Sequence, residues 1–447
     1  MKRKPIVRKT IDYSCSVITH VKKRSANNKS INYLQPHADY AHRIEPMFAL
    51  EQADRGNVSH AYLTKYFGTS YNKERSSVNC LHWTPNAHRL ITGTHKGELT
   101  LWHGQNFSFE TLFVAHEAPI RCAKWTPDEA FLVSSDDAGV IKYWRANMTP
   151  ARTLPRRIFG GGSKLAVYGL TFSPLIGSLS PKFMACSDDR TIRLYDFETG
   201  AEERCLEGHQ AEVRSVAWHP TMALVLSAGR DGDLKFWDAR LGSHVSSTPN
   251  AAPLTKVTWN ANGQWFLTAS RDQLIRHYDC RRHDTPVAMY EGHKREVTCV
   301  EWHPQFESLF ASGSVDGRVC YWIAGEGESE EKENKLPVAE ICGAHDGAIL
   351  TLAWHPLGHL LATGGLDYSY KVWTRNRPGD EMRDQYNVNQ LPEPERKEAM
   401  LDLLHAVEVQ NSVYPKLPVA LEGFKDKLEE ETIAEEEEQA FPDDCFD

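Results

Sequence analysis

Residues 208–238 read GHQAEVRSVAWHPTMALVLSAGRDGDLKFWD, and their pattern predicts the type of fold. It contains a Gly-His pair, a Trp-His-Pro turn, short apolar runs, an Asp, and a closing Trp-Asp. Within a run such as Leu234–Trp237, apolar and polar residues alternate, which is the pattern of a half-buried strand. The stretch therefore predicts several short strands joined by tight turns.

The same unit recurs along the chain. Its closing aromatic residues are Trp102, Trp144, Tyr195, Trp237, Tyr278, Trp322 and Trp373. Successive positions lie 42, 51, 42, 41, 44 and 51 residues apart, close to the roughly 40–45 residues of a propeller blade. One four-stranded sheet cannot bury both of its faces, whereas a closed ring of sheets covers them. We therefore predict an all-β protein, a seven-bladed WD-repeat β-propeller.

The 447 residues divide around this ring. We predict a basic N-terminal arm over 1–60, the propeller over 61–375, a polar extension over 376–424 and a disordered acidic tail over 425–447. No strand-like run follows Trp373, so residues near 61–67 should supply the missing outer strand of the seventh blade. The extension carries apolar residues at helical spacing, which predicts a short amphipathic helix. These residues are Met400, Leu403, Leu404 and Val407.

Three units contain a His, a Ser or Thr, an Asp and a Trp that can form a hydrogen-bonded relay within a blade. The sets are His209, Ser227, Asp231 and Trp237; His293, Ser312, Asp316 and Trp322; and His345, Thr363, Asp367 and Trp373. Leaving one such buried group unpaired costs ~1–3 kcal/mol, so we interpret these residues as structural and not catalytic. Lys96 and Ala138 stand at the Asp position of the first two units, and Tyr195 and Tyr278 close the third and fifth, which predicts broken relays there.

Other classes of function find no support. The chain has no HExxH, GxSxG or P-loop motif, and its ten Cys include no CxxC pair, so we expect no enzyme, metal or cofactor. No apolar run approaches the roughly 20 residues of a membrane helix, so we expect no membrane partner. The charge is uneven: residues 1–24 hold eight Lys or Arg, and residues 428–447 hold ten acids. A basic arm on a near-neutral body indicates contact with a polyanion at one end.

Two segments outside the ordinary repeat are more specific. Residues 8–13 (RKTIDY) and 374–380 (TRNRPGD) closely resemble the WD-repeat subunit of the cleavage and polyadenylation specificity factor. The resemblance implies a non-catalytic scaffold in the nucleus that helps to recognise the AAUAAA-type signal of pre-mRNA. It also implies three protein partners, namely the zinc-finger subunit, the large propeller subunit and the poly(A) polymerase machinery.

By the same resemblance, RNA lies along the arm and the first blade. The implied RNA-binding residues are Arg3, Lys4, Arg8, Tyr71, Lys73, Phe109 and Leu112. These residue types suit the chemistry, because single-stranded RNA is held by cations on phosphates and by flat side chains stacked on bases.

Two alternatives stay open. Residues 237–240 (WDAR) resemble the WDxR box by which substrate receptors of cullin-RING ubiquitin ligases hold their adaptor. The chain could also be a protein-only scaffold of the same processing complex, with no RNA contact.

Overall fold

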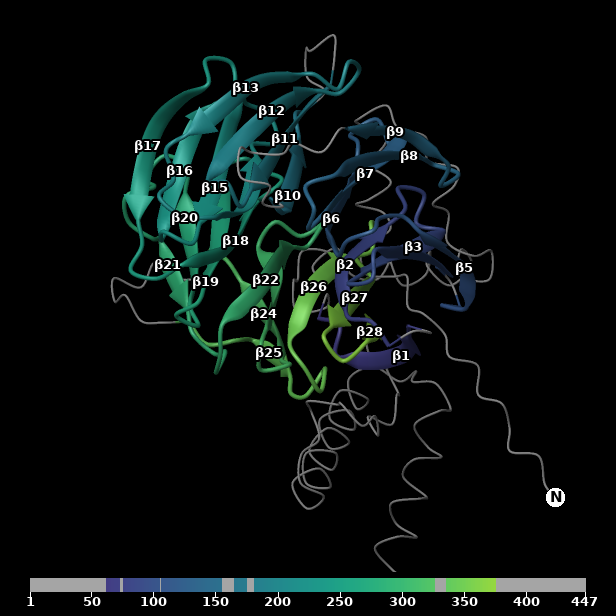
Figure 1. The fold of residues 1–447 in the computed structure, drawn as a ribbon. Helices are drawn as coiled ribbons and strands as arrows, with labels where there is room; N and C mark the ends of the chain where they lie inside the picture. Colours follow the sequence, from purple (N-terminus) through teal and green to yellow (C-terminus); the bar gives the residue numbers. More distant parts are fainter. Residues whose placement is uncertain are drawn as a thin grey trace, which may run out of the picture. The chain divides into compact units, whose positions relative to one another are not determined.

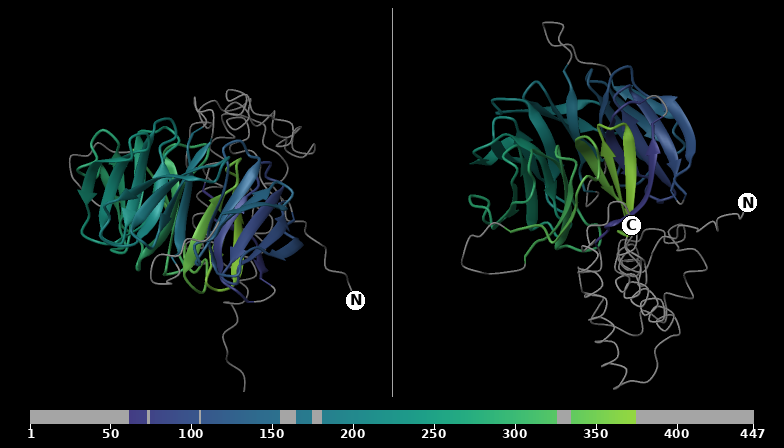
Figure 2. Two further views of the ribbon diagram at one scale, coloured as in Figure 1. Left: turned by 45° about the horizontal axis from the view of Figure 1, so that its top comes forward. Right: turned by 90° about the horizontal axis from the view of Figure 1, so that it is seen from below.

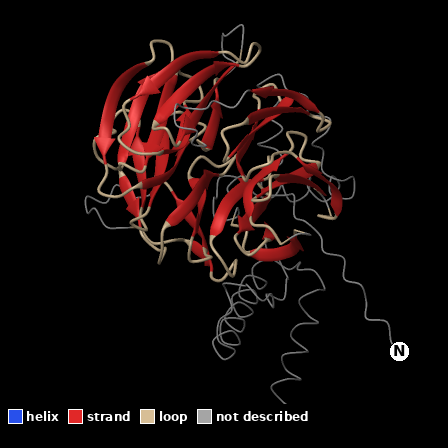
Figure 3. Ribbon diagram, in the orientation of Figure 1, coloured by secondary structure: helices blue, strands red, loops and turns tan. Residues whose placement is uncertain are grey.

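The computed structural model describes residues 62–72, 75–104, 106–154, 165–174, 181–325 and 335–374. Over these ranges the chain forms strands and no helix (Figure 3). The strands make seven four-stranded antiparallel sheets, which are the blades of the propeller (Figure 1). The predicted amphipathic helix, the basic arm and the acidic tail lie outside the described residues.

Blades 1 to 4 each use four consecutive strands. Blade 1 contains β2 (Val78–Trp83), β3 (Arg89–Thr94), β4 (Glu98–His103) and β5 (Phe109–Val114). Blade 2 contains β6 (Ile120–Trp125), β7 (Phe131–Asp136), β8 (Ile141–Arg145) and β9 (Pro150–Leu154). Blade 3 contains β10 (Val167–Phe172), β11 (Lys182–Ser187), β12 (Thr191–Asp196) and β13 (Glu202–Glu207). Blade 4 contains β14 (Val213–Trp218), β15 (Leu224–Gly229), β16 (Asp233–Asp238) and β17 (Ser243–Pro249).

Blades 5 and 6 follow the same order, and blade 7 departs from it. Blade 5 contains β18 (Leu254–Trp259), β19 (Trp265–Ser270), β20 (Ile275–Asp279) and β21 (Ala288–Tyr290). Blade 6 contains β22 (Val297–Trp302), β23 (Leu309–Ser314), β24 (Val319–Ile323) and β25 (Ala339–Ile341). Blade 7 combines β26 (Ile349–Trp354), β27 (Leu360–Gly365) and β28 (Ser369–Thr374) with β1 (Lys65–Tyr71) from the other end of the chain.

The ring closes through β1. This strand runs antiparallel to β28, from Lys65 opposite Thr374 to Tyr71 opposite Ser369. The strand begins at Lys65, four residues after the start of the segment 61–67 that was predicted from the sequence. Leu63, two residues before the strand, is buried against blade 6. The Tyr321 hydroxyl of blade 6 donates to the Leu63 carbonyl at 2.8 Å. The pairing leaves β28 with a neighbour on each side.

The first strand of each blade lies innermost. Each of these strands contacts the first strand of the next blade, and β26 contacts β2, so the inner strands form a closed ring. Figure 2 shows the blades from two further sides. Each innermost strand has a register shift near its start, for example between Val78 and Cys80 in β2. Such bulges increase the local twist of a strand, which suits strands that stand side by side around an axis.

A second set of His residues links neighbouring blades. The His of each Trp-His-Pro turn stacks edge-on against the Trp that ends the first strand of the following blade. The pairs are His219 with Trp259 at 4.6 Å, His303 with Trp354 at 4.6 Å and His355 with Trp83 at 4.7 Å between ring centroids. Each of these Trp side chains also donates to a backbone carbonyl of the preceding blade at 3.2–3.3 Å. We call these contacts the interblade latches.

Candidate functional site

The relay residues of blades 4 and 7 lie within hydrogen-bonding distance of one another. In blade 4, the His209 ring contacts Asp231 at 2.8 Å through Nδ1 and Ser227 at 2.7 Å through Nε2, and Trp237 donates to the same Ser227 oxygen at 2.9 Å. In blade 7, the His345 ring contacts Asp367 at 2.9 Å and Thr363 at 2.7 Å. Both ring nitrogens of each His therefore have a hydrogen-bond partner.

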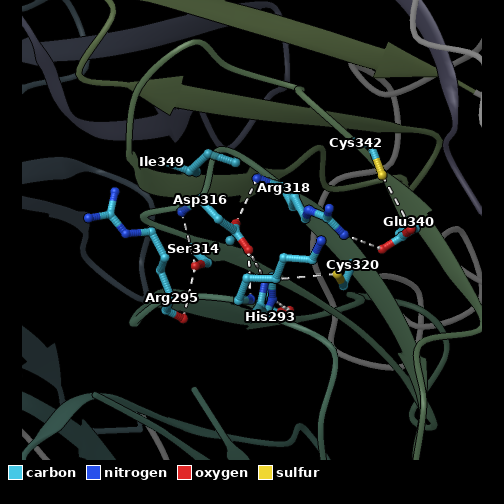
Figure 4. Close-up of polar contacts among 12 residues, drawn as sticks. His293, Arg295, Ser314, Asp316, Arg318, Cys320, Glu340, Cys342 and Ile349 are labelled. Atoms are coloured by element: carbon cyan, nitrogen blue, oxygen red, sulfur yellow. Dashed lines mark hydrogen bonds and ion pairs between the residues drawn. The ribbon is translucent and has the colours of Figure 1, made fainter. Parts of the chain in front are cut away.

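Blade 6 contains a looser version of the relay, of which Figure 4 labels His293 and Asp316. The His293 ring contacts Ser312 at 2.6 Å, and Trp322 donates to Ser312 at 2.7 Å. The Asp316 carboxylate lies 3.7 Å from Nδ1 of His293, beyond hydrogen-bonding distance, and accepts instead from the Lys294 backbone amide at 3.0 Å.

Blade 2 corrects the sequence prediction. Ala138 occupies the expected Asp position, but Asp136, two residues earlier in the same turn, contacts Nδ1 of His116 at 3.0 Å. Nε2 of His116 contacts Ser134 at 2.7 Å, and Trp144 donates to Ser134 at 2.9 Å. The relay predicted as broken is complete, because an Asp side chain at the end of β7 reaches the same His nitrogen from a different backbone position.

Blades 1 and 5 keep fragments of the relay. In blade 1, Trp102 donates to Thr92 at 3.1 Å. In blade 5, Tyr278 replaces the Trp and donates its hydroxyl to Asn250 at 2.9 Å, while its ring stacks on Phe266. Asn250 precedes the first strand by four residues, which is the position of His209 in blade 4.

The charged states of the relay carboxylates agree with a structural assignment. Burial would raise the pKa of Asp367, but hydrogen bonds from His345 and Ser369 lower it to about 2. Burial raises the pKa of the Cys186 and Cys299 thiols to about 12, so these groups stay protonated at neutral pH.

Among the described residues, no group of three or more metal-ligating side chains forms a metal site. No helix in the same ranges is long and apolar enough to cross a membrane.

The outer parts of blades 7 and 1 touch through residues that neighbour two of the sequence-predicted residues, Tyr71 and Phe109, in the chain. The Ser70 hydroxyl of β1 and the Tyr370 hydroxyl of β28 both donate to the Phe107 carbonyl, at 3.3 and 3.4 Å. Phe107 belongs to the turn between β4 and β5, and its ring meets Phe67 edge-on at 5.4 Å. We call this contact region the 7–1 junction.

Two exposed aromatic residues lie close in sequence to the 7–1 junction, but only Phe109 faces it, because Tyr71 pairs with Ser369 on the face of β1 opposite Ser70. Tyr71 follows Ser70 at the end of β1 and is 69% exposed, and Phe109 begins β5 and is 55% exposed. The Phe109 ring is held edge-on by Trp102 at 5.9 Å, and Trp102 itself packs on Tyr370 of blade 7. Phe109 therefore lies on the side of blade 1 that faces blade 7.

The remaining predicted RNA-binding residues divide into two groups. Leu112 is half-buried in β5, opposite Thr100 of β4. Arg3, Lys4, Arg8 and Lys73 lie outside the described residues. A cation that the sequence reasoning missed is Arg75, which is exposed in the segment between β1 and β2. Only its position beside Lys73 in the sequence could have singled it out.

The other face of blade 1 has a different character. Arg89 makes a bidentate pair with Glu110, with N–O distances of 2.7 and 2.6 Å. This pair lines a shallow hollow together with Asn86, His88 and His103. Arg89 shares a face of β3 with Ile91, which packs against blade 2, whereas Phe109 packs on Trp102 towards blade 7, so the hollow and the exposed Phe109 ring lie on opposite faces of blade 1.

The WDxR-like segment of blade 4 makes a local contact. The Arg240 backbone amide donates to the Asp238 carboxylate at 2.8 Å, and its guanidinium lies 3.6 Å from the same carboxylate. These are the contacts of a residue that caps the turn after β16.

The family model for the WD domain, G-beta repeat, matches residues 66–103, 107–145, 200–238, 242–279, 284–322 and 337–374. The unmatched stretch from 146 to 199 contains most of blade 3, which the structure nevertheless folds as a four-stranded sheet. Fold and repeats together define this chain as a WD-repeat β-propeller.

The chain is also similar to fungal proteins named polyadenylation factor subunit 2. It is 31% identical to that of Candida albicans over 385 residues, covering 80% of this chain and 69% of the relative. The protein of Schizosaccharomyces pombe is 31% identical over 432 residues, covering 92% and 82%. That of Neurospora crassa is 29% identical over 417 residues, covering 87% and 60%. The chain belongs to the polyadenylation factor subunit 2 family, which confirms the WD-repeat polyadenylation factor predicted from the sequence.

Proposed function

We propose that this chain is a non-catalytic scaffold and RNA-binding subunit of the machinery that cleaves and polyadenylates pre-mRNA in the nucleus. The family assignment supports a role in mRNA 3′-end processing. The architecture supports a binding role, because the His and Asp side chains of the relays are engaged with one another inside the blades. A reactive His would need a free nitrogen facing a substrate.

The observation that carries the RNA-binding part is the exposed Phe109 ring at the 7–1 junction. An aromatic ring that is 55% exposed and held edge-on by a buried Trp is a preformed surface for a base. Leu112 adds apolar surface on the same face of β5 as Phe109, and we propose that Tyr71 contacts the RNA further along its path, with Arg3, Lys4, Arg8 and Lys73 as cations for phosphates. We assign this surface to the AAUAAA-type polyadenylation signal.

Phe109, Tyr71 and Leu112 are too few to contact all six bases of the signal, so we expect a second subunit to bind the other bases. We propose the zinc-finger subunit of the cleavage and polyadenylation specificity factor for that role. The large propeller subunit would hold both proteins, and the poly(A) polymerase machinery would act on the RNA they present.

A salt titration of RNA binding tests the proposal. The full chain is mixed with the zinc-finger subunit, and binding to a labelled AAUAAA-containing RNA is followed by fluorescence anisotropy at several salt concentrations. Each lost phosphate contact flattens the log–log salt slope by roughly 0.7 for a single strand. The triple variant Arg3→Ala, Arg8→Ala, Lys73→Ala should therefore bind more weakly and with a flatter slope.

A matched triple variant controls for net charge. Arg281, Arg282 and Lys294 are exposed on blades 5 and 6, and replacing all three with Ala removes the same charge far along the chain from the 7–1 junction. This control should bind RNA like the wild type. If the first triple variant also binds like the wild type at every salt concentration, the chain is a protein-only scaffold. Co-purification with a cullin adaptor in place of polyadenylation subunits would favour the WDxR alternative.

A further inference from the structure

One turn of blade 7 has an unusual side chain at a strained backbone position. Tyr368, between β27 and β28, has a φ of +66°. The equivalent residue of every blade has a positive φ. These residues are Gly97, Gly139, Arg190, Gly232, Gln273, Gly317 and Tyr368. Glycine adopts this conformation freely, whereas a bulky residue rarely does. Blade 7 places an aromatic residue where four blades use glycine.

The same turn is also unusually apolar on its outside. Tyr368 is 44% exposed and Leu366 is 52% exposed, so burial does not compensate the strain at Tyr368. The residues that correspond to Leu366 in blades 2 to 5 are charged, namely Asp137, Asp188, Arg230 and Arg271, whereas blade 1 has His95 and blade 6 has Val315. These residues are equivalent because, in each blade, the backbone amide of this residue donates to a backbone carbonyl just before the first strand, as Leu366 does to Ala348.

This turn adjoins the aromatic end of β1. The Asn72 backbone amide donates to the Tyr368 carbonyl at 3.0 Å, which ties the chain just after Tyr71 to the turn. Tyr71, Leu366 and Tyr368 together form what we call the blade 7 patch. The acid inside this turn, Asp367, points into the relay, where it contacts His345 at 2.9 Å, and its side chain is only 13% exposed.

Cations lie on the next segment of the chain. Arg75 is exposed three residues after Asn72, and its backbone amide donates to the Asn72 carbonyl at 3.1 Å. Lys96 is exposed in the corresponding turn of blade 1, where its amide donates to Ser76 at 3.2 Å. Exposed tyrosines beside exposed cations form the combination that holds single-stranded nucleic acid.

We propose that Tyr368 is a further RNA-contacting residue, which stacks on a base of single-stranded RNA next to the one at Tyr71. This inference rests on the proposed function and deepens it, because it extends the RNA path from the 7–1 junction onto the blade 7 patch. The strained backbone conformation is then the cost of presenting an aromatic ring at this position.

Replacing Tyr368 with Gly tests the role of this side chain in RNA binding without an expected loss of stability. Gly suits the positive φ, so Tyr368→Gly should keep or raise the melting temperature. The same variant should weaken binding of the full chain and zinc-finger subunit to the AAUAAA-containing RNA by roughly 5- to 150-fold, the loss of one stacked base. The salt slope should stay unchanged, because no phosphate contact is removed.

Two further variants make the comparison specific. Gln273→Gly changes the equivalent residue of blade 5, at a φ of +73°, and should affect stability in the same way without weakening RNA binding. Tyr368→Phe keeps the ring and should retain wild-type affinity. Wild-type affinity of Tyr368→Gly, with lost affinity of the Arg3, Arg8 and Lys73 triple variant, would overturn this inference and leave the proposed function standing.

The remaining outcomes are equally decisive. If Tyr368→Gly and the Arg3, Arg8 and Lys73 triple variant both bind RNA with wild-type affinity, the proposed function is overturned together with this inference. Unchanged RNA binding of Tyr368→Gly, with loss of a co-purifying protein subunit, would make the blade 7 patch a protein-docking surface and overturn the RNA assignment.

Discussion

In blades 2, 4 and 7, both ring nitrogens of the relay His are occupied by hydrogen bonds to neighbouring side chains. Each complete relay joins one His nitrogen to a carboxylate and the other to a hydroxyl, and the hydroxyl also accepts from a Trp. The relay thus gives hydrogen-bond partners to buried polar atoms, which would lower the stability of the sheet if they stayed unpaired.

The blade 2 relay should be as important for stability as the three visible in the sequence. Asp136→Ala leaves Nδ1 of the fully buried His116 without its partner and should lower the free energy of unfolding by ~1–3 kcal/mol. Thermal denaturation measures the effect. Asp284→Asn is the control, because the Asp284 side chain is 90% exposed and its replacement should be nearly neutral. Equal melting temperatures for Asp136→Ala and wild type would show that the relay does not stabilise blade 2.

The pKa of Asp367 predicts an acid-sensitive contribution. Its pKa of about 2 in the fold lies below the ~3.9 of an unfolded Asp, so the carboxylate stabilises the fold above pH ~4 and loses this effect as the pH falls towards 2. Asp367→Asn should therefore be less stable than wild type at pH 7, and the difference should shrink between pH 4 and pH 2. Denaturant titrations at several pH values test this. A difference that stays constant over that range would contradict it.

At the scale of elements, the interblade latches connect sheets that the relays do not reach. His355 stacks on Trp83 of blade 1, and its Nδ1 accepts from the Leu357 backbone amide at 3.1 Å. His355→Ala should remove both contacts at the boundary where the ring closes and lower stability by ~1–3 kcal/mol. His219→Ala removes the corresponding latch between blades 4 and 5 and should have a similar effect on the melting temperature. A neutral His355→Ala variant would show that β1 alone secures the closure.

Strand β1 is the element on which closure depends. Deleting residues 1–71 removes it and leaves β28 with an unpaired edge, which is a template for aggregation. The shortened chain should be insoluble or oligomeric in size-exclusion chromatography, whereas deletion of residues 1–61 leaves the strand intact and should give a monomer. A monomer with unchanged melting temperature after the longer deletion would refute this role of β1.

For the whole molecule, the sequence predicts the ring better than its details. Seven aromatic residues at blade spacing were enough for the propeller, because each repeat must bury its faces against the next. The relay of blade 2 was missed because fixed spacing cannot show that Asp136 reaches His116 from another point of the turn. The interblade latches were missed because they join residues that lie about 40 or more positions apart. Tyr368 was missed because its backbone conformation and exposure are three-dimensional properties.

The proposed RNA surface makes a last prediction that separates its two kinds of contact. Phe109→Ala removes a stacking ring and should weaken RNA binding by ~1–3 kcal/mol, with little change in the salt slope. Arg75→Ala removes an exposed cation beside the blade 7 patch and should flatten the slope by roughly 0.7, with equal weakening for a signal and a scrambled hexamer. Discrimination between the two hexamers should therefore fall only for Phe109→Ala. Loss of discrimination in Arg75→Ala, with none in Phe109→Ala, would place base recognition away from the 7–1 junction.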